Sequence, residues 1–141
     1  MIIDDKLMNY VLYKMRTESE VRQKCKILKL DEEYVEEAVE YLKEANYIND
    51  EIYAKKYIEN IMRLKHCSQN EIKIDLLKRG IDQNTIENYL YTEETLEFEE
   101  ESAKYLINKK ISLGEEPLKI KKYMINKGYD FSLIEKYLFS D

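Results

Sequence analysis

The sequence predicts an all-α protein of three tandem three-helix repeats, arranged as an elongated array that can be straight or curved. Three observations predict this fold. Only three Gly and one Pro interrupt 141 residues, so long helices are expected and an all-β fold is not. One segment recurs along the chain, and typical helix start and stop residues lie at the same places in its copies.

The recurring segment is clearest in residues 72–90, IKIDLLKRGIDQNTIENYL, and residues 120–138, IKKYMINKGYDFSLIEKYL. These two copies share the glycine at Gly80 and Gly128 and many flanking positions. A weaker third copy begins at Val21, with Lys29 in place of the glycine. A repeat of about 50 residues is typical of arrays in which each unit stacks on its neighbour.

An amphipathic segment precedes each copy, so every unit is expected to contain three helices. These leading segments are residues 7–15, 53–64 and 102–111. The predicted units are residues 1–48, 49–91 and 92–141. Because one such unit makes a thin core, we expect stacked neighbours to complete the burial.

Helix termini support the same division. Thr17 and Glu20, like Ser68 and Glu71, have the spacing of a reciprocal cap at a helix start. The repeated glycines are expected to end the preceding helix in a left-handed conformation. The expected caps of the following helix are Asp31, Asp82 and Asp130.

Apolar residues four and five positions apart mark the buried face of the recurring helix. This face is expected to contain Ile72, Leu76, Leu77, Ile120, Met124 and Ile125. Most of the matched tyrosines are expected to pack in the core or between units rather than to stack on bases. They are Tyr53, Tyr57, Tyr89, Tyr105, Tyr123 and Tyr137.

Charge and targeting signals restrict the class of protein. Charged residues make up 37% and the net charge is -6, which argues against indiscriminate DNA binding and leaves only local nucleic-acid contact. Residues 1–5 lack a basic leader followed by an apolar stretch, and no run could span a bilayer. We therefore expect a cytoplasmic protein without membrane contact. Because Cys25 and Cys67 lie far apart and the cytoplasm is reducing, we also expect no disulfide.

Two segments resemble the RecX family of recombinase regulators. Residues 47–58, YINDEIYAKKYI, resemble a pattern in which an aromatic, an aliphatic, two acidic or amide residues and Glu precede an aromatic-Ala helix. Residues 19–25, SEVRQKC, resemble the family's Ser/Glu, aliphatic, Arg, x, Lys, aliphatic run. The family also has three repeats of three helices at this spacing.

This resemblance implies a protein that lies in the groove of the RecA recombinase filament across several subunits. It also implies that the chain modulates, and more specifically inhibits, filament extension, ATP hydrolysis and strand exchange. Such a role belongs to DNA repair, homologous recombination and the SOS response. The expected molecule is a monomer that contacts RecA and, locally, the DNA in the filament.

A broken basic stripe is the candidate partner-binding site. Arg22, Lys73 and Lys121 occupy one repeat position, and Arg79 and Lys127 occupy another. The full set is Arg16, Arg22, Lys24, Lys26, Lys73, Arg79, Lys121, Lys122 and Lys127. The alternative is that these cations merely favour the C-terminal halves of helices, where they interact with the helix dipole.

Other features of the sequence suggest different functions. The acidic residues in 31–51 and 93–101 suggest a DNA mimic, but carboxylates also crowd ordinary helix starts. His66 and Cys67 lack the further ligands of a zinc site and a third group to orient them for catalysis. We therefore predict no catalytic, cofactor-binding or metal-binding residues, and no enzyme activity. A helix-turn-helix DNA-binding module and a scaffold with an unrelated protein partner remain as alternatives.

Overall fold

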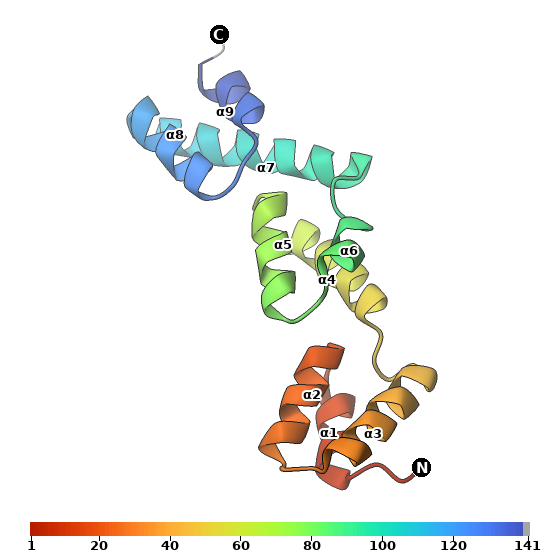
Figure 1. Ribbon diagram of the computed structural model, residues 1–141. Helices are drawn as coiled ribbons and strands as arrows, with labels where there is room; N and C mark the ends of the chain where they lie inside the picture. Colours follow the sequence, from red (N-terminus) through yellow and green to blue (C-terminus); the bar gives the residue numbers. More distant parts are fainter. Residues whose placement is uncertain (140–141) are drawn as a thin grey trace.

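The computed structural model describes residues 1–139, and this part of the chain folds into nine α-helices without a strand. Their bounds are α1 Asp5–Tyr13, α2 Glu18–Ile27, α3 Glu32–Glu44, α4 Asp50–Leu64, α5 Gln69–Lys78, α6 Gln83–Glu87, α7 Glu93–Ser112, α8 Pro117–Asn126 and α9 Phe131–Leu138. The all-α prediction is confirmed. Figure 1 shows the helices in three successive groups along an elongated molecule, with α1 and α9 at opposite ends.

Each group of three helices has its own apolar core. The first core includes Leu7 and Leu42, the second Ile58 and Ile86, and the third Ile134. Phe98 of α7 is partly buried against the second core. The buried apolar residues form three clusters, and Phe98 shows that a neighbouring group adds to the burial of the second one. We infer that each group is one unit.

The first and second units meet where α2 begins and α5 ends. The Thr17 hydroxyl donates a hydrogen bond to the carbonyl oxygen of Arg79 over 2.7 Å. The Glu18 amide donates to an Asp50 carboxylate oxygen over 2.9 Å. Ser19 packs so tightly on Gly80 that a Cβ there would overlap the serine Cβ. This joint is thus polar and requires a glycine.

The second and third units meet in the same way. The Ser68 hydroxyl donates to the carbonyl oxygen of Lys127, and the Gln69 amide donates to a Glu99 carboxylate oxygen over 2.9 Å. Asn70 packs on Gly128, where a Cβ would collide with the asparagine side chain. The start of each recurring helix therefore meets the end of the next one.

The predicted helix termini are largely confirmed. Both capping boxes form at α2 and α5, and Gly80 and Gly128 have a φ of 85°. Lys29 adopts the same left-handed region, with a φ of 57°. Asp82 and Asp130 cap α6 and α9, but Asp31 makes no side-chain hydrogen bond at the start of α3.

Helix α7 differs from its expected length. It begins at Glu93, nine residues before the predicted 102–111 segment, because Thr92 and Thr95 form a capping box. Glu93 and Glu94 occupy the first turn, where carboxylates stabilise exposed N–H groups. The added turns bring Glu99 to the second joint. No helix in residues 1–139 combines the length and apolar character needed to cross a membrane.

Candidate interaction surface

The nine cations of the predicted stripe have different surroundings. Arg22, Lys73 and Lys121, which share one repeat position, each form an ion pair with a glutamate of the following helix. The nitrogen–oxygen distances are 2.6 Å for Arg22–Glu36, 3.4 Å for Lys73–Glu87 and 3.3 Å for Lys121–Glu135. These three cations therefore join the second and third helices of their own units.

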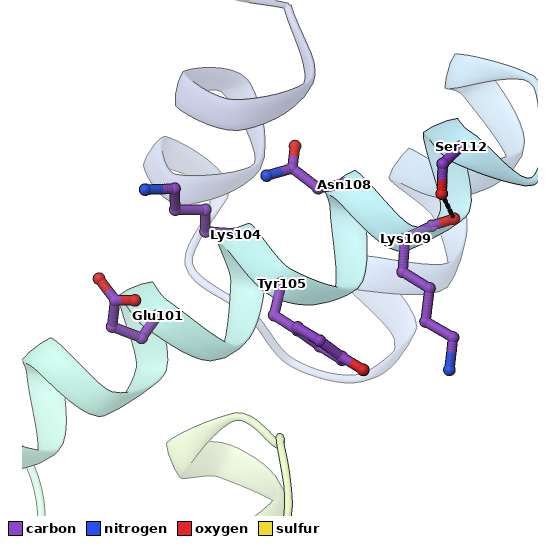
Figure 2. A pocket seen from close by; sticks show the side chains of 6 residues that line it. All are labelled: Glu101, Lys104, Tyr105, Asn108, Lys109 and Ser112. Atoms are coloured by element: carbon purple, nitrogen blue, oxygen red, sulfur yellow. Dashed lines mark hydrogen bonds between the residues drawn. The ribbon is translucent and has the colours of Figure 1, made fainter.

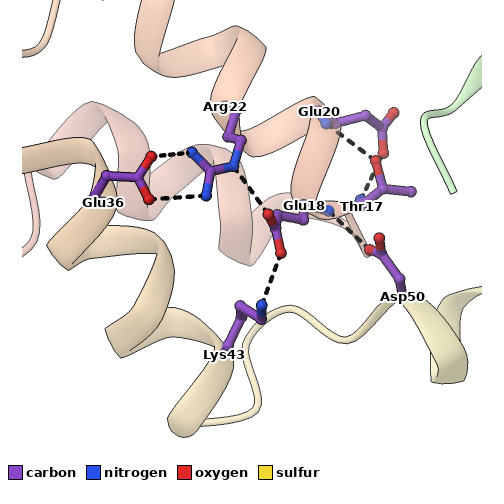
Figure 3. Close-up of polar contacts among 7 residues, drawn as sticks. All are labelled: Thr17, Glu18, Glu20, Arg22, Glu36, Lys43 and Asp50. Carbon is purple, nitrogen blue, oxygen red and sulfur yellow. Dashed lines mark hydrogen bonds and ion pairs between the residues drawn. The ribbon is translucent and has the colours of Figure 1, made fainter. Parts of the chain in front are cut away.

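Arg22 is the most constrained of the three, as Figure 3 shows. Its guanidinium binds both carboxylate oxygens of Glu36 and also an oxygen of Glu18, which in turn pairs with Lys43 over 3.0 Å. These hydrogen bonds, first that to Glu36, raise the pKa of Arg22 above its ordinary value. The hydrogen bond from Arg22 likewise lowers the pKa of Glu36.

A second subset of the stripe lies over tyrosine rings. The Arg16 guanidinium carbon is 3.7 Å from the centroid of Tyr10, and the Lys24 ammonium lies 5.3 Å from the same centroid. Arg79 donates to the Tyr53 hydroxyl over 2.8 Å and lies above the Tyr57 ring. Such contacts hold a cation in place while leaving its charge unneutralised.

Lys127 lies 5.6 Å from the centroid of the Tyr123 ring. The remaining members of the stripe, Lys26 and Lys122, are exposed and have no acidic partner within 4.0 Å in the described chain. Lys78, which the stripe did not include, is also exposed and has no ion pair there. The structure thus separates internally paired cations from cations available on the surface.

The available lysines lie on the outer faces of α2, α5 and α8. Each face consists of three residues at positions i, i+3 and i+4, which share one side of a helix. The nine residues are all exposed, and we name them the second-helix face: Gln23, Lys26, Ile27, Ile74, Leu77, Lys78, Lys122, Ile125 and Asn126. No residue of this face is acidic, although the chain has a net charge of -6.

The second-helix face corrects one sequence expectation. Ile72, Leu76, Ile120 and Met124 are buried as predicted, but Leu77 and Ile125 are exposed. Because each lies one position beyond a buried residue, the helical rotation of about 100° carries its side chain off the core. The signal that was missed is the same exposed apolar position in two repeats.

The faces of α2 and α5 adjoin at the first joint. Ile27 and Lys78 line a single groove of about 420 Å³, together with Gln23 and Tyr10. Figure 1 shows α2, α5 and α8 along the same side of the molecule. Glu20 also lines the groove, but its carboxylate accepts a hydrogen bond from the Thr17 amide.

Another hollow lies on α7, where Glu101, Lys104, Tyr105, Asn108, Lys109 and Ser112 line a volume of about 570 Å³ (Figure 2). The Tyr105 ring stacks on His66 with centroids 4.0 Å apart. Tyr105 is 48% exposed, but its contact with His66 of the second unit is the expected packing between units, whereas Tyr123 is 37% exposed and lies outside the core. The core expectation holds for Tyr53, which is buried.

The two cysteines are not suited to nucleophilic chemistry. Both side chains are buried and unpaired by a disulfide. Burial raises the pKa of the Cys67 thiol to about 11, so it stays protonated at neutral pH. His66 is occupied by its stacking contact with Tyr105. Within residues 1–139, no group of three or more His, Cys, Asp or Glu side chains is arranged to hold a metal ion.

Comparison with known proteins found close relatives. A protein named regulatory protein RecX from Caldanaerobacter subterraneus is 38% identical over 125 residues, covering 89% of this chain and 63% of its own length. A second one, from Clostridium beijerinckii, is 34% identical over 122 residues, covering 82% and 56%. The chain therefore spans about three fifths of the length of these relatives. No family model matches it.

Solved structures have the same fold. The crystal structure of RecX from Lactobacillus salivarius is 29% identical, with a TM-score of 0.83 over 96% of this chain and 91% of that one. Another crystal structure of a regulatory protein RecX is 27% identical, with a TM-score of 0.85 over 96% and 70%. The similarity thus extends through all three helix groups.

Proposed function

The chain belongs to the RecX family of regulatory proteins, and from this we propose that it binds the RecA recombinase filament and inhibits its activity. The proposed effects are slower ATP hydrolysis, restricted filament extension and reduced strand exchange. The protein acts by binding rather than by catalysis, as a monomer in the cytoplasm. The observation that carries the proposal is its similarity to RecX proteins in both sequence and fold.

The shape of the molecule supports this mode of action. Three helix groups follow one another along an elongated chain, and the two joints between them repeat the same contacts. A row of similar units can contact successive subunits of a helical polymer, so each weak contact raises the effective concentration of the next. Binding that favours one filament state would shift the filament toward that state.

The proposed contact region is the basic stripe, but its members contribute differently. Arg22, Lys73 and Lys121 are neutralised by glutamates within their own units. We therefore assign partner contact to the remaining six cations: Arg16, Lys24, Lys26, Arg79, Lys122 and Lys127. Local contact with DNA in the filament is part of the proposal, since unpaired cations also attract phosphates.

Co-sedimentation tests the proposal. RecA of the same organism is assembled on single-stranded DNA with a nonhydrolysable ATP analogue, and the protein is titrated in. We expect it to sediment with the filament and to stay in solution when RecA is omitted. Absence from the filament pellet, with helicity intact by circular dichroism, would contradict the proposal. Sedimentation with DNA alone would favour a DNA-binding module instead.

A further inference from the structure

We propose that the second-helix face, and not the whole basic stripe, contacts the partner, and that it fits an acidic and apolar protein surface repeated once per subunit. This inference rests on the proposed function, because it assigns the surface through which filament binding occurs. It keeps only Lys26 and Lys122 of the stripe, leaves out the other seven cations, and adds Lys78 and four exposed apolar residues. These are Ile27, Ile74, Leu77 and Ile125.

The composition of the face is the first argument. Each of its three helices presents one exposed lysine without an acidic partner in the described chain: Lys26, Lys78 and Lys122. Lys78 and Lys122 each have an exposed isoleucine four or three residues away on the same side, Ile74 and Ile125, and Lys26 is followed directly by the exposed Ile27. An apolar centre bordered by charge is the usual composition of a protein-binding surface.

The residues of the second-helix face contribute neither to the apolar core nor to an ion pair within the described part of the protein. The buried face of the same helices already supplies the core through Val21, Ile72 and Ile120. By contrast, Lys73 and Lys121, which share a repeat position on another side of these helices, each form an ion pair with a glutamate. The second-helix face therefore keeps both its charge and its apolar area for an external contact.

Charge complementarity selects the partner. A surface with three lysines and no acid attracts carboxylates, whereas the acidic remainder of the chain repels a continuous polyanion such as DNA. Aliphatic side chains gain from burial against apolar protein residues, while single-stranded DNA is usually bound by aromatic side chains. The nine residues of the face include no aromatic residue.

The spacing matches a repeated partner. The faces of α2 and α5 share one groove, and α8 continues the same side of the array (Figure 1). Each joint is fixed by the same hydroxyl-to-carbonyl hydrogen bond, from Thr17 to Arg79 and from Ser68 to Lys127. Three similar faces at fixed intervals can thus engage three neighbouring copies of one acidic and apolar surface.

A pair of triple variants tests the inference. The first is Lys26→Glu, Lys78→Glu and Lys122→Glu on the second-helix face. The matched control is Lys6→Glu, Lys55→Glu and Lys104→Glu, which changes three exposed lysines, one in each first helix, and so gives the same net charge. Affinity for the RecA filament on single-stranded DNA is measured by fluorescence anisotropy, and thermal unfolding is followed by circular dichroism.

We expect the face variant to bind the filament about tenfold or more weakly, because each reversal replaces an attraction by a repulsion. The control should bind within about threefold of the unchanged protein. Equal binding by both variants, or equal loss in both, would overturn the inference while leaving the proposed function intact. Failure of the unchanged protein to bind would instead reject the proposed function and the inference together.

An uncharged variant provides a second test. Leu77→Ser with Ile125→Ser removes two exposed apolar side chains without altering the charge, and its folding should be nearly unchanged because both residues are exposed. We expect weaker filament binding in this variant as well. If only the lysine variant loses binding, and it also loses binding to bare single-stranded DNA, the surface binds nucleic acid and the protein-partner assignment is wrong.

Discussion

At the scale of single residues, the repeated glycines have two roles. Gly80 and Gly128 adopt the left-handed conformation that ends a helix, and they also receive a side chain of the preceding unit. The sequence predicted the first role from position, because a helix followed by an aspartate cap needs a turn. The second role depends on which surfaces meet, and the sequence pattern carries no such information. Lys29 adopts the same conformation in the first unit.

Replacing Gly80 by Ala should separate these two roles. Gly114 has a φ of 79° but no atom within 4 Å of an added Cβ, so Gly114→Ala should cost only the left-handed conformation, roughly 1–2 kcal/mol. Gly80→Ala should cost about 1–3 kcal/mol more because its Cβ overlaps Ser19. Urea unfolding of both variants measures the difference. Equal destabilisation would show that the tight joint contact is absent.

At the scale of helices and joints, the sequence predicted best those features that depend on residues close together in the chain. The capping boxes of α2 and α5 follow from hydroxyl and carboxylate residues three positions apart, and both form. The early start of α7 could have been predicted from Thr92 and the two glutamates after it. The ion pairs could also have been anticipated, since Glu36, Glu87 and Glu135 share a repeat position.

Other features of the candidate surface depend on packing. Apolar spacing placed Leu77 and Ile125 in the core, because periodicity cannot resolve how wide the buried strip of a helix is. The stacking of Tyr105 on His66 is packing between units, as expected for the matched tyrosines, but no local pattern predicts that His66 is the partner. Sequence reasoning therefore located the helices of the surface but not the side of each helix that is exposed.

The contact between the second and third units, where Gln69 donates to Glu99, predicts that stability depends on pH. Burial raises the pKa of Glu99, although hydrogen bonds from Gln69 oppose the shift. The folded protein therefore binds this proton more tightly than the unfolded chain does, so the Glu99 contribution to stability falls as pH rises above the ordinary value of 4.5. Glu99→Gln should remove this loss, and the variant should gain stability relative to the unchanged protein between about pH 4.5 and 7.

Urea unfolding of the two proteins at several pH values measures this difference. Glu101→Gln is a suitable control, because Glu101 is an exposed residue of the same helix. A constant difference between Glu99→Gln and the unchanged protein across this range would contradict the assignment of a raised pKa to Glu99.

At the scale of the whole molecule, three separate apolar cores are linked by polar joints. This arrangement was not predicted, because composition and periodicity do not reveal whether neighbouring units share their buried residues. The elongated form follows from the joints, in which one helix start meets the end of the next recurring helix. Such a chain can span several subunits of a polymer while each unit keeps its own packing.

Separate cores predict local rather than global loss of structure. Met124→Ala removes a fully buried side chain from the third core and should destabilise that unit by about 2–5 kcal/mol. Amide hydrogen exchange should accelerate in α7, α8 and α9 but change little in α1, α2 and α3. Equal acceleration in all three units would instead show that the array unfolds as one cooperative body.

Regulation of a recombinase filament is the central claim, and it is tested most directly by ATP hydrolysis. The rate of ATP hydrolysis by RecA of the same organism is measured on single-stranded DNA. The concentration of this protein is raised from far below that of RecA until the two are equal. We expect hydrolysis to fall at ratios well below one to one, because a row of units contacts several subunits at once. Unchanged hydrolysis up to equal stoichiometry, with the protein folded by circular dichroism, would contradict the account.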